Sequence, residues 1–360
     1  MTEKSAMPKR GRSLLVLRVL RQRIADGTYP LETKLPSERN LAQDFEVSRV
    51  TIRKSLEILK SNGMITRRPG LGNIISATAP VAPPTPPNIG FVVQHLSNPY
   101  YSAFASALEA VLRAHDLNMV LAGTGQNPDE ELRCLQRMSE LQVRGVLLCV
   151  PDRLHHPEAM KSFLNQRLPV VIIGGRQAGV ALDTVDSDNR AGMTAAIAHL
   201  LELGHTRIGF LSAMAYDRSD VRMELTAELL RARGLKPGPV VVVDTPDLAG
   251  GRLAFDRLLE QKDRPTAVLC TNDITAIGAI QRAFELGVSI PGEISIVGYD
   301  DIPMASMATV PLTTVAVPLA ELAELAFERL SARAEGYSGG PIHLMIEPQL
   351  VERASTAVPG

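Results

Sequence analysis

Cysteine is scarce in this chain. Its 360 residues include three cysteines, Cys134, Cys149 and Cys270, and they form neither a CxxC pair nor a spacing typical of metal ligands. All three lie inside apolar stretches, so we expect buried thiols rather than a disulfide framework or a metal site. This usage favours a reducing cytosol.

Long apolar runs are also missing. No run of about 18 apolar residues occurs anywhere in the chain, so no segment is predicted to span a membrane. Residues 1–11 are basic and polar, and no apolar region with a small-residue cleavage site follows them. We therefore expect a cytoplasmic protein that is neither secreted nor membrane-bound.

Two common cofactor-binding signatures are absent. The stretch GTGQNP fails the dinucleotide fingerprint GxGxxG at its third glycine, and no GxxxxGK[ST] phosphate loop occurs. His155 and His156 lack further ligands at zinc spacing, and His199 and His205 have no nucleophile partner in their contexts. We expect no catalytic residues, no metal and no cofactor, with an α/β-domain enzyme as a remote alternative.

The charge is distributed unevenly along the chain. Residues 1–78 hold 15 Lys and Arg against 7 Asp and Glu, whereas residues 79–360 hold 23 against 32, so the net charges are +8 and −9. A small basic module joined to a larger acidic one indicates that only the first meets a polyanion. A solvated basic surface without a partner is the simpler alternative.

A proline-rich segment separates the two parts. The stretch ATAPVAPPTPPN has five prolines in twelve residues, which neither a helix nor a central strand accommodates. We interpret it as a linker over 77–88 between domains 1–76 and 89–360. A ligand for a proline-reading domain is the alternative, and its place between two folded segments disfavours it.

Three helices and a hairpin are predicted in the first domain. Apolar residues at helical spacing run from Ser13 to Ala25, and N-cap serines at Ser37 and Ser48 begin two further helices. The sequence MITRRPGLGNIIS then alternates and breaks at Pro69-Gly70 and Gly72, as a two-stranded hairpin does. This order predicts a winged helix-turn-helix.

The helix that begins at Ser48 has a basic outer face. At 100° per residue, Ile52, Leu56 and Leu59 form the buried side, and Val50, Arg53 and Lys54 lie opposite. Recognition helices contact base edges with their N-terminal residues, so we expect contact to end near Lys54, before Glu57.

Several polar side chains of this domain suit DNA contact. Arginine donates to guanine or to phosphate, and Ser48 and Thr51 carry hydroxyl groups that bond phosphate oxygens. Arg67-Arg68, followed by Gly70 and Gly72, forms a basic tip that fits a minor groove. Taken alone, that tip is also compatible with an ordinary turn.

The segment KLPSERNLAQDFEVSRVTIRKSLEILKSNGMITRRPGLGNII closely resembles the GntR-type winged helix-turn-helix. The LPSER-x-LA, VSR-x-T-x-R and RR-x-G-x-G elements occur in order and spacing. One departure is Glu32, where the family commonly has glycine. The resemblance implies that the DNA contacts are Arg39, Ser48, Arg49, Thr51, Arg53 and Arg68 to Gly72, to which we add Lys54 and Arg67.

The larger domain alternates apolar strands with helical patterns. Eight such strands, NIGFVV, NMVLAG, RGVLLCV, PVVIIGG, TRIGFLS, PVVVVD, TAVLCT and ISIVGYD, are typical of parallel sheets covered on both faces. This number exceeds one doubly wound sheet, so we predict two α/β lobes with a cleft between them.

Polar residues follow these strands, where open parallel sheets bind ligands. Tyr100 and Tyr101 follow the first strand, Arg176 follows another, and Asn272-Asp273 and Asp300-Asp301 follow two more. Carboxylates and amides there suit a hydroxyl-rich ligand. The alternatives are core packing for the tyrosines and helix capping for Asn272 or Asp301. Arg222, in a predicted helix, would on spacing alone be solvated.

This domain, over about residues 88–353, resembles the effector domain of the lactose/galactose-repressor family, which is related to periplasmic sugar-binding proteins. The stretches that carry the likeness include DSDNRAG, RMELTAELLRARGL, AVLCTNDITAIGAI and VSIPGEISIVGYDD. The resemblance implies an effector cleft lined by Tyr101, Arg222, Asn272 and Asp300. Leu319 replaces a frequent aromatic and Gly174 an occasional acid, so the ligand's identity stays open.

The two resemblances together predict the fold class: an N-terminal winged helix-turn-helix (α+β) followed by a two-lobed α/β domain like the periplasmic binding proteins. A GntR-type reader on such a domain resembles the arabinose repressor architecture. It implies a sequence-specific transcriptional regulator, a repressor, that binds a palindromic double-stranded DNA operator as a homodimer. The implied effector is a small sugar, reasonably a pentose, bound between the lobes, with a nucleoside or another non-sugar ligand as the alternative. The predicted effector-binding residues are Tyr100, Tyr101, Arg176, Arg222, Asn272 and Asp300.

Overall fold

The chain divides into two compact units, Met1–Thr85 and Pro86–Gly360. The computed structural model describes residues 12–61, 64–69, 71–76, 88–125, 127–149, 168–174, 181–213 and 221–360. The predicted linker, 77–88, lies outside the described residues except for Asn88, which begins a strand.

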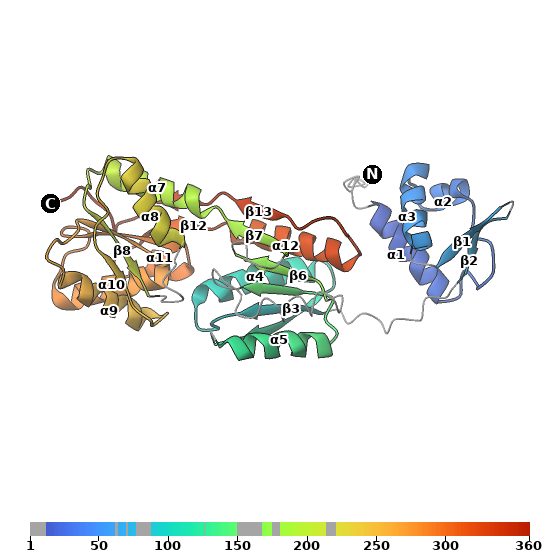
Figure 1. Cartoon of the computed structure of the whole chain (residues 1–360), viewed down its shortest axis with the longest axis horizontal. Coiled ribbons are helices and arrows are strands. Elements are labelled where there is room, and N and C mark those ends of the chain that lie inside the picture. The colour runs from blue at the N-terminus through green and yellow to red at the C-terminus, as the bar shows by residue number, and fades with distance from the viewer. Residues whose placement is uncertain are drawn as a thin grey trace, which may run out of the picture. The chain divides into compact units, whose positions relative to one another are not determined.

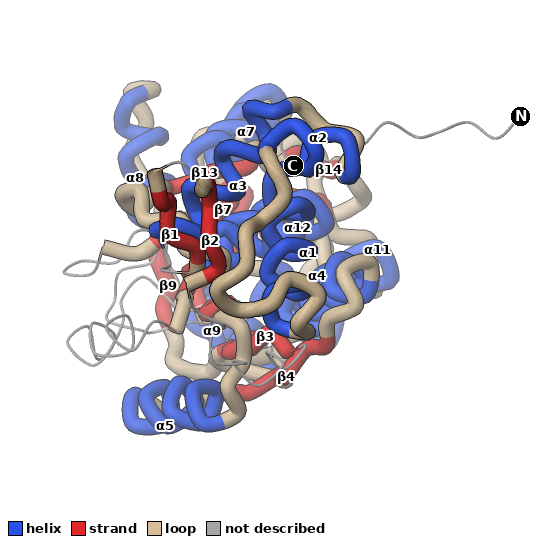
Figure 2. Tube along the Cα trace, turned by 90° about the vertical axis from the view of Figure 1, so that its right-hand side faces the viewer, coloured by secondary structure: helices blue, strands red, loops and turns tan. Residues whose placement is uncertain are grey.

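The first unit is a winged helix-turn-helix, as predicted. Three helices pack around a core that includes Leu20, Leu41 and Ile52, and an antiparallel hairpin follows them (Figures 1 and 2). The elements are α1 (Arg12–Ala25), α2 (Glu38–Asp44), α3 (Arg49–Ser61), β1 (Ile65–Arg68) and β2 (Gly72–Ile75).

Local bonds explain where these elements begin. The Ser37 hydroxyl accepts a hydrogen bond from the Asn40 amide at 3.2 Å and caps α2. The Ser48 hydroxyl accepts from the Thr51 amide at 3.2 Å, so α3 begins as predicted. Glu32, the departure from the GntR-type pattern, has a left-handed φ of 59°, a backbone conformation that favours glycine.

The second unit contains two six-stranded sheets. Every pairing of neighbours is parallel except that of β12 with β14. The first sheet has the order β13-β7-β6-β5-β3-β4 and the second β14-β12-β11-β10-β8-β9. The strands are β3 (Asn88–Val93), β4 (Asn118–Gly123), β5 (Val146–Cys149), β6 (Val170–Ile173), β7 (Asp183–Ser187), β8 (Ile208–Ser212), β9 (Val240–Val242), β10 (Ala267–Cys270), β11 (Ser295–Asp300), β12 (Thr313–Ala316), β13 (His343–Ile346) and β14 (Gln349–Val351).

All eight predicted strands are present, and four strands were missed. The missed strands, β7, β12, β13 and β14, are three to five residues long and less uniformly apolar than the predicted ones, as the sequence DTVDS of β7 illustrates. The two predicted α/β lobes are confirmed.

Helices cover both faces of each sheet. In the first lobe, α4 (Pro99–Arg113) and α12 (Leu319–Ala334) cover one face and α5 (Pro128–Glu140) the other, as Figure 1 shows. In the second lobe, α7 and α8 pack on one face and α9, α10 and α11 on the other. Their bounds are α7 (Asn189–Glu202), α8 (Val221–Ala232), α9 (Leu248–Leu259), α10 (Asp273–Leu286) and α11 (Pro303–Met307).

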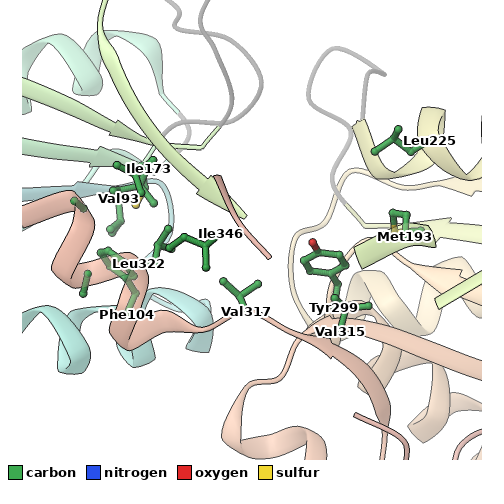
Figure 3. Packing of buried hydrophobic residues seen from close by; sticks show 14 of the residues in the cluster. Val93, Phe104, Ile173, Met193, Leu225, Tyr299, Val315, Val317, Leu322 and Ile346 are labelled. Carbon is green, nitrogen blue, oxygen red and sulfur yellow. The ribbon is translucent and has the colours of Figure 1, made fainter. Parts of the chain in front are cut away.

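Within the described residues, the chain passes between the lobes three times. The crossovers are 187–189 between β7 and α7, 316–319 between β12 and α12, and 346–349 between β13 and β14. These three crossovers form the hinge between the lobes, and one core cluster continues across it. Val93 and Phe104 lie on the first-lobe side of the hinge and Tyr299 on the second-lobe side, with Val317 and Ile346 between them (Figure 3).

Candidate functional site

The outer face of α3 is basic, as its periodicity predicted. Val50 is 63% exposed, and Ile52, Leu56 and Leu59 are buried. The Ser48 and Thr51 hydroxyls are hydrogen-bonded at 2.8 Å at the start of the helix. The cations Arg39 on α2 and Arg49, Arg53 and Lys54 on α3 are exposed. This surface of the helix-turn-helix can meet a polyanion.

Arg53 has an intramolecular partner that the sequence analysis missed. Its Nη2 lies 3.1 Å from Oε2 of Glu38, and its Nε lies 3.5 Å from Oε1 of the same carboxylate. Because Glu38 is on α2, the pair ties the two helices together on the basic face. The only sequence signal for it is an acid in the first turn of α2.

The hairpin presents two further cations. Arg67 and Arg68, at the end of β1, are exposed and pair in register with Asn73 and Gly72. Gly72 has a φ of 94°, which residues other than glycine rarely adopt, so glycine suits this position. Gly70 lies outside the described residues.

In the second unit, Arg222 on α8 is held by groups from several elements. Its Nη1 donates to the Thr271 carbonyl oxygen at 2.5 Å, and its Nε donates to Asn189 Oδ1 at 2.9 Å. Its Cζ lies 3.7 Å from the centroid of the Tyr299 ring. The alternative of a solvated arginine is therefore wrong.

Asp300 lies beside Arg222 at the end of β11. Its Oδ1 is 3.9 Å from Arg222 Nη2. Burial raises the pKa of Asp300 to about 7, and the Arg222 guanidinium opposes that rise. The backbone of Asp300 has a φ of 114°, which is strained for a residue other than glycine.

The turn after β11 is held by buried polar contacts. Asp273 is fully buried; its Oδ2 accepts from the Ile302 amide at 2.9 Å, and its Oδ1 accepts from the Thr314 hydroxyl. Burial, and then the neighbouring Asp300 carboxylate, raise the pKa of Asp273 well above its ordinary value. Asp301 pairs with Arg353 Nη2 at 2.7 Å. These contacts fix the strained backbone of Asp300.

Asn272 and Asp301 were the two possible helix caps, and one of them is a cap in the structure. Asn272 is the N-cap of α10, since its Oδ1 accepts from the amide and the hydroxyl of Thr275 at 3.0 and 2.8 Å. Asp301 is not a cap, because Ile302 holds that position for α11.

The two tyrosines after β3 pack against different core clusters. Their rings meet edge to face with centroids 5.5 Å apart. Tyr101 packs against the cluster that continues across the hinge and donates to Gln94 Oε1 at 3.4 Å, whereas Tyr100 packs against the second cluster of the second lobe. Burial raises the pKa of Tyr100 well above its ordinary value, with contributions from Cys149 and Asp300. Tyr100 therefore reaches the second lobe from α4.

The remaining candidates add little to this site. Gly174, where the resemblance allows an acid, has a φ of 129°. This backbone conformation favours glycine. Leu319 is partly buried against the core. Arg176, His155 and His156 lie outside the described residues.

Residues 336–340 have the sequence GYSGG, which fits the GxSxG signature of a nucleophile elbow. A nucleophile elbow lies between a strand and a helix, but this segment follows helix α12. Arg333 donates to the Tyr337 and Gly339 carbonyl oxygens and lies 5.2 Å from the Tyr337 ring centroid. The segment is thus the turn that ends a helix.

The part of the chain that the structure describes offers neither a metal-binding cluster nor a membrane-spanning helix. Within the described ranges, no three His, Cys, Asp or Glu side chains are grouped so as to hold a metal ion. The helices that the structure describes include none that is long and apolar enough to cross a membrane. The three cysteines are buried and free, as expected.

Comparison with known proteins follows this division of the chain. Residues 14–75 match the model for bacterial regulatory proteins of the gntR family, and residues 197–356 match that of a periplasmic binding protein-like domain. The ribose operon repressor of Haemophilus influenzae is 30% identical over 269 residues, which cover 74% of this chain and 80% of that protein.

Two further proteins are similar to this chain, one over nearly its whole length and one over about three quarters of it. The arabinose metabolism transcriptional repressor of Geobacillus stearothermophilus is 28% identical over 349 residues, or 92% of this chain and 94% of that one. The crystal structure of a LacI family transcriptional regulator from Mycobacterium smegmatis matches 76% of this chain and all of its own, with a TM-score of 0.66 and 29% identity. The chain belongs to the LacI/GalR-type family of DNA-binding transcriptional repressors, and carries a gntR-family winged helix-turn-helix as its DNA-binding domain.

Proposed function

We propose that this repressor is controlled by a small sugar-like effector bound between the two lobes of its second unit. The observation that carries the proposal is the pairing of Arg222 on α8 with Asp300 at the end of β11. Tyr100 of α4, in the opposite lobe, is near enough for the Asp300 carboxylate to contribute to its raised pKa. Two relatives are named for ribose and arabinose operons, which supports a sugar.

The proposed site suits a neutral polyol. The Arg222 guanidinium donates hydrogen bonds and the Asp300 carboxylate accepts them, so hydroxyl groups satisfy both. Tyr100 and Tyr101 offer apolar faces for the carbon skeleton of a sugar. Asn272 and Arg176 remain proposed contacts, the first beside its capping role and the second outside the described residues.

We propose that α3 enters the major groove of a double-stranded operator and that the hairpin contacts the neighbouring backbone or minor groove. The exposed cations of α2 and α3 support this placement. The proposed contacts are Arg39, Ser48, Arg49, Thr51, Arg53, Lys54, Arg67, Arg68, Gly70 and Gly72.

A homodimer is the proposed assembly, and an apolar surface on the second lobe supports it. Phe284 and Met307 are each 73% exposed. A hollow of about 170 Å³ adjoins Met307 and is lined by Ile277, Ile280, Gln281, Met304, Ala308 and Thr309. Exposed apolar side chains beside a hollow indicate a surface that another chain covers, and a two-fold dimer suits a palindromic operator.

A two-step experiment tests the function. Thermal unfolding is measured with pentoses, hexoses and nucleosides, and the compound that raises the melting temperature is then added to an operator-binding assay by fluorescence anisotropy. We expect a sugar to stabilise the protein and to change operator affinity. A rise in melting temperature with nucleosides alone would identify the effector as a nucleoside instead of a sugar. Stabilisation without any change in operator affinity would contradict regulation by the bound compound.

A further inference from the structure

We propose that Tyr299 is a positioning residue that couples the effector-binding Arg222 to the hinge between the lobes. The inference rests on the proposed function, and it concerns a residue that the sequence analysis passed over. Tyr299 lies in β11, directly before Asp300, and is fully buried. It is one of the largest fully buried side chains that the structure describes.

The ring of Tyr299 supports the guanidinium of Arg222. Arg222 Cζ lies 3.7 Å from the ring centroid, within the distance at which a cation and an aromatic face attract. The guanidinium edges are directed to Asn189 and Thr271. Because the ring is packed in the core, it fixes the plane in which Arg222 can meet a ligand.

The hydroxyl of the same side chain reaches the first crossover between the lobes. Tyr299 Oη lies 3.1 Å from Ser187 Oγ, and both residues are buried. Ser187 ends β7 of the first lobe, whereas Tyr299 belongs to the second-lobe sheet. A Cβ on Gly192 of α7 would lie 2.8 Å from Tyr299 Oη, so the hydroxyl is enclosed against that helix. In Figure 3 the hydroxyl is directed away from Val315.

The hydrogen bond of the Tyr299 hydroxyl to Ser187 affects how the two lobes are arranged. The Ser187–Tyr299 bond spans a crossover, so rotation of one lobe against the other changes its angle, and hydrogen bonds weaken steeply with misalignment. A buried hydroxyl left without its partner is costly. The bond therefore favours the present lobe arrangement. A ligand that moves Arg222 over the ring acts on this bond, which is the two-state coupling that allostery requires.

Lobe distance in the complete protein, without sugar or DNA, tests the inference. Cysteines replace two exposed residues, Glu109 on α4 and Lys262 after α9. They receive paramagnetic labels, labelled chains are diluted with unlabelled ones, and the distance distribution is measured by pulsed dipolar spectroscopy. The variants are Tyr299→Phe, Ser187→Ala and the double variant.

Loss of one hydrogen bond should change the ratio of lobe arrangements about three- to tenfold, in the same direction in both single variants. The double variant should go no further than either, because both remove one bond. Ser295→Ala is the matched control, since its hydroxyl bonds His205 and Ala357 inside the second lobe. It should leave the distances unchanged.

Wild-type distributions in Tyr299→Phe and Ser187→Ala, or fully additive effects in the double variant, would overturn the inference. Ser187→Ala is the smaller change and keeps the test valid if the tyrosine variant folds poorly. Because neither sugar nor operator is present, such a result would leave the proposed function standing. The proposed function fails separately, in the sugar and operator assays.

Discussion

Glu38 on α2 and Arg53 on α3 form an ion pair across the helix-turn-helix, with Oε2 and Nη2 3.1 Å apart. Both side chains belong to the surface proposed to meet DNA. A carboxylate there repels phosphate, so its presence has to be reconciled with binding. Orientation of the guanidinium is the physical role we infer, since an arginine donates two bonds to guanine only in a fixed plane.

Glu38→Gln should therefore lower the ratio of operator affinity to non-specific DNA affinity, by about tenfold if the pair orients a base contact. Loss of a negative charge should at the same time strengthen non-specific binding. Fluorescence anisotropy with operator and scrambled duplexes at several salt concentrations measures both. Glu57→Gln removes the same charge from α3 without breaking this ion pair. Equal specificity ratios in the two variants would argue against orientation.

Arg222→Ala should abolish the change in operator affinity that the effector causes, and leave operator binding without effector at its wild-type value. The reason is that Arg222 is in the second unit, at the proposed ligand site, and its side chain bonds Asn189 and Thr271. Effector affinity by calorimetry and operator affinity by anisotropy separate these effects. Arg190→Ala, which breaks an exposed ion pair with Glu228, is the control. Loss of operator binding in Arg222→Ala would count against the site.

Asp300→Asn should remove a pH dependence of stability. The pKa of Asp300 rises from 3.8 to about 7 on folding, so the folded protein binds a proton that the unfolded chain releases. Stability due to this group is present below about pH 4 and is lost as pH rises to about 7. The free energy of unfolding of the variant, relative to that of wild type, should therefore rise by a few kcal/mol between about pH 4 and pH 7. Above about pH 7 this difference should stay constant.

Urea unfolding at pH 4.5, 6 and 8 measures this difference, with Asp263→Asn as the exposed control. The neighbouring Asp273 should respond as well, because the Asp300 carboxylate contributes to the rise of its pKa. A stability difference that stays constant from pH 4.5 to 8 would contradict the buried, partly protonated carboxyl.

Met307→Asp should convert the proposed dimer to monomers, because a carboxylate at a 73% exposed methionine beside the apolar hollow would be buried in the proposed interface without a partner. Sedimentation velocity over a range of concentrations measures the change, and operator affinity should fall with it. Val240→Asp, at a 46% exposed position on the edge strand β9, is the control. A dimer that survives Met307→Asp would place the interface elsewhere.

Local patterns predicted the secondary structure of the first unit and much of the second. The spacing of Ile52, Leu56 and Leu59 identified the inner face of α3, and strand-like apolar runs identified eight strands. β7 and β12 could not be found in this way, because polar residues such as Asp183 and Thr313 are buried in them by contacts from distant segments.

The candidate site was predicted as a set of residues but not as an arrangement. Motif resemblance supplied Arg222 and Asp300, yet the stacking of Arg222 on Tyr299 depends on α8 and β11, which are about 70 residues apart in sequence. The Glu38–Arg53 pair likewise depends on how α2 packs against α3. Asp273 was one of the polar residues noted after a strand, and its hydrogen bonds to Ile302 and Thr314 give it a structural role.

The three crossovers also determine how this protein can be cut and recombined. The first unit is one continuous segment, so a different DNA-binding module can replace it through a single junction. Each lobe, by contrast, is assembled from separated stretches of chain, with α12 and β13 returning to the first lobe after the second is built. Exchange of one lobe between relatives would need three junctions, all within the hinge that is proposed to control the response to the effector.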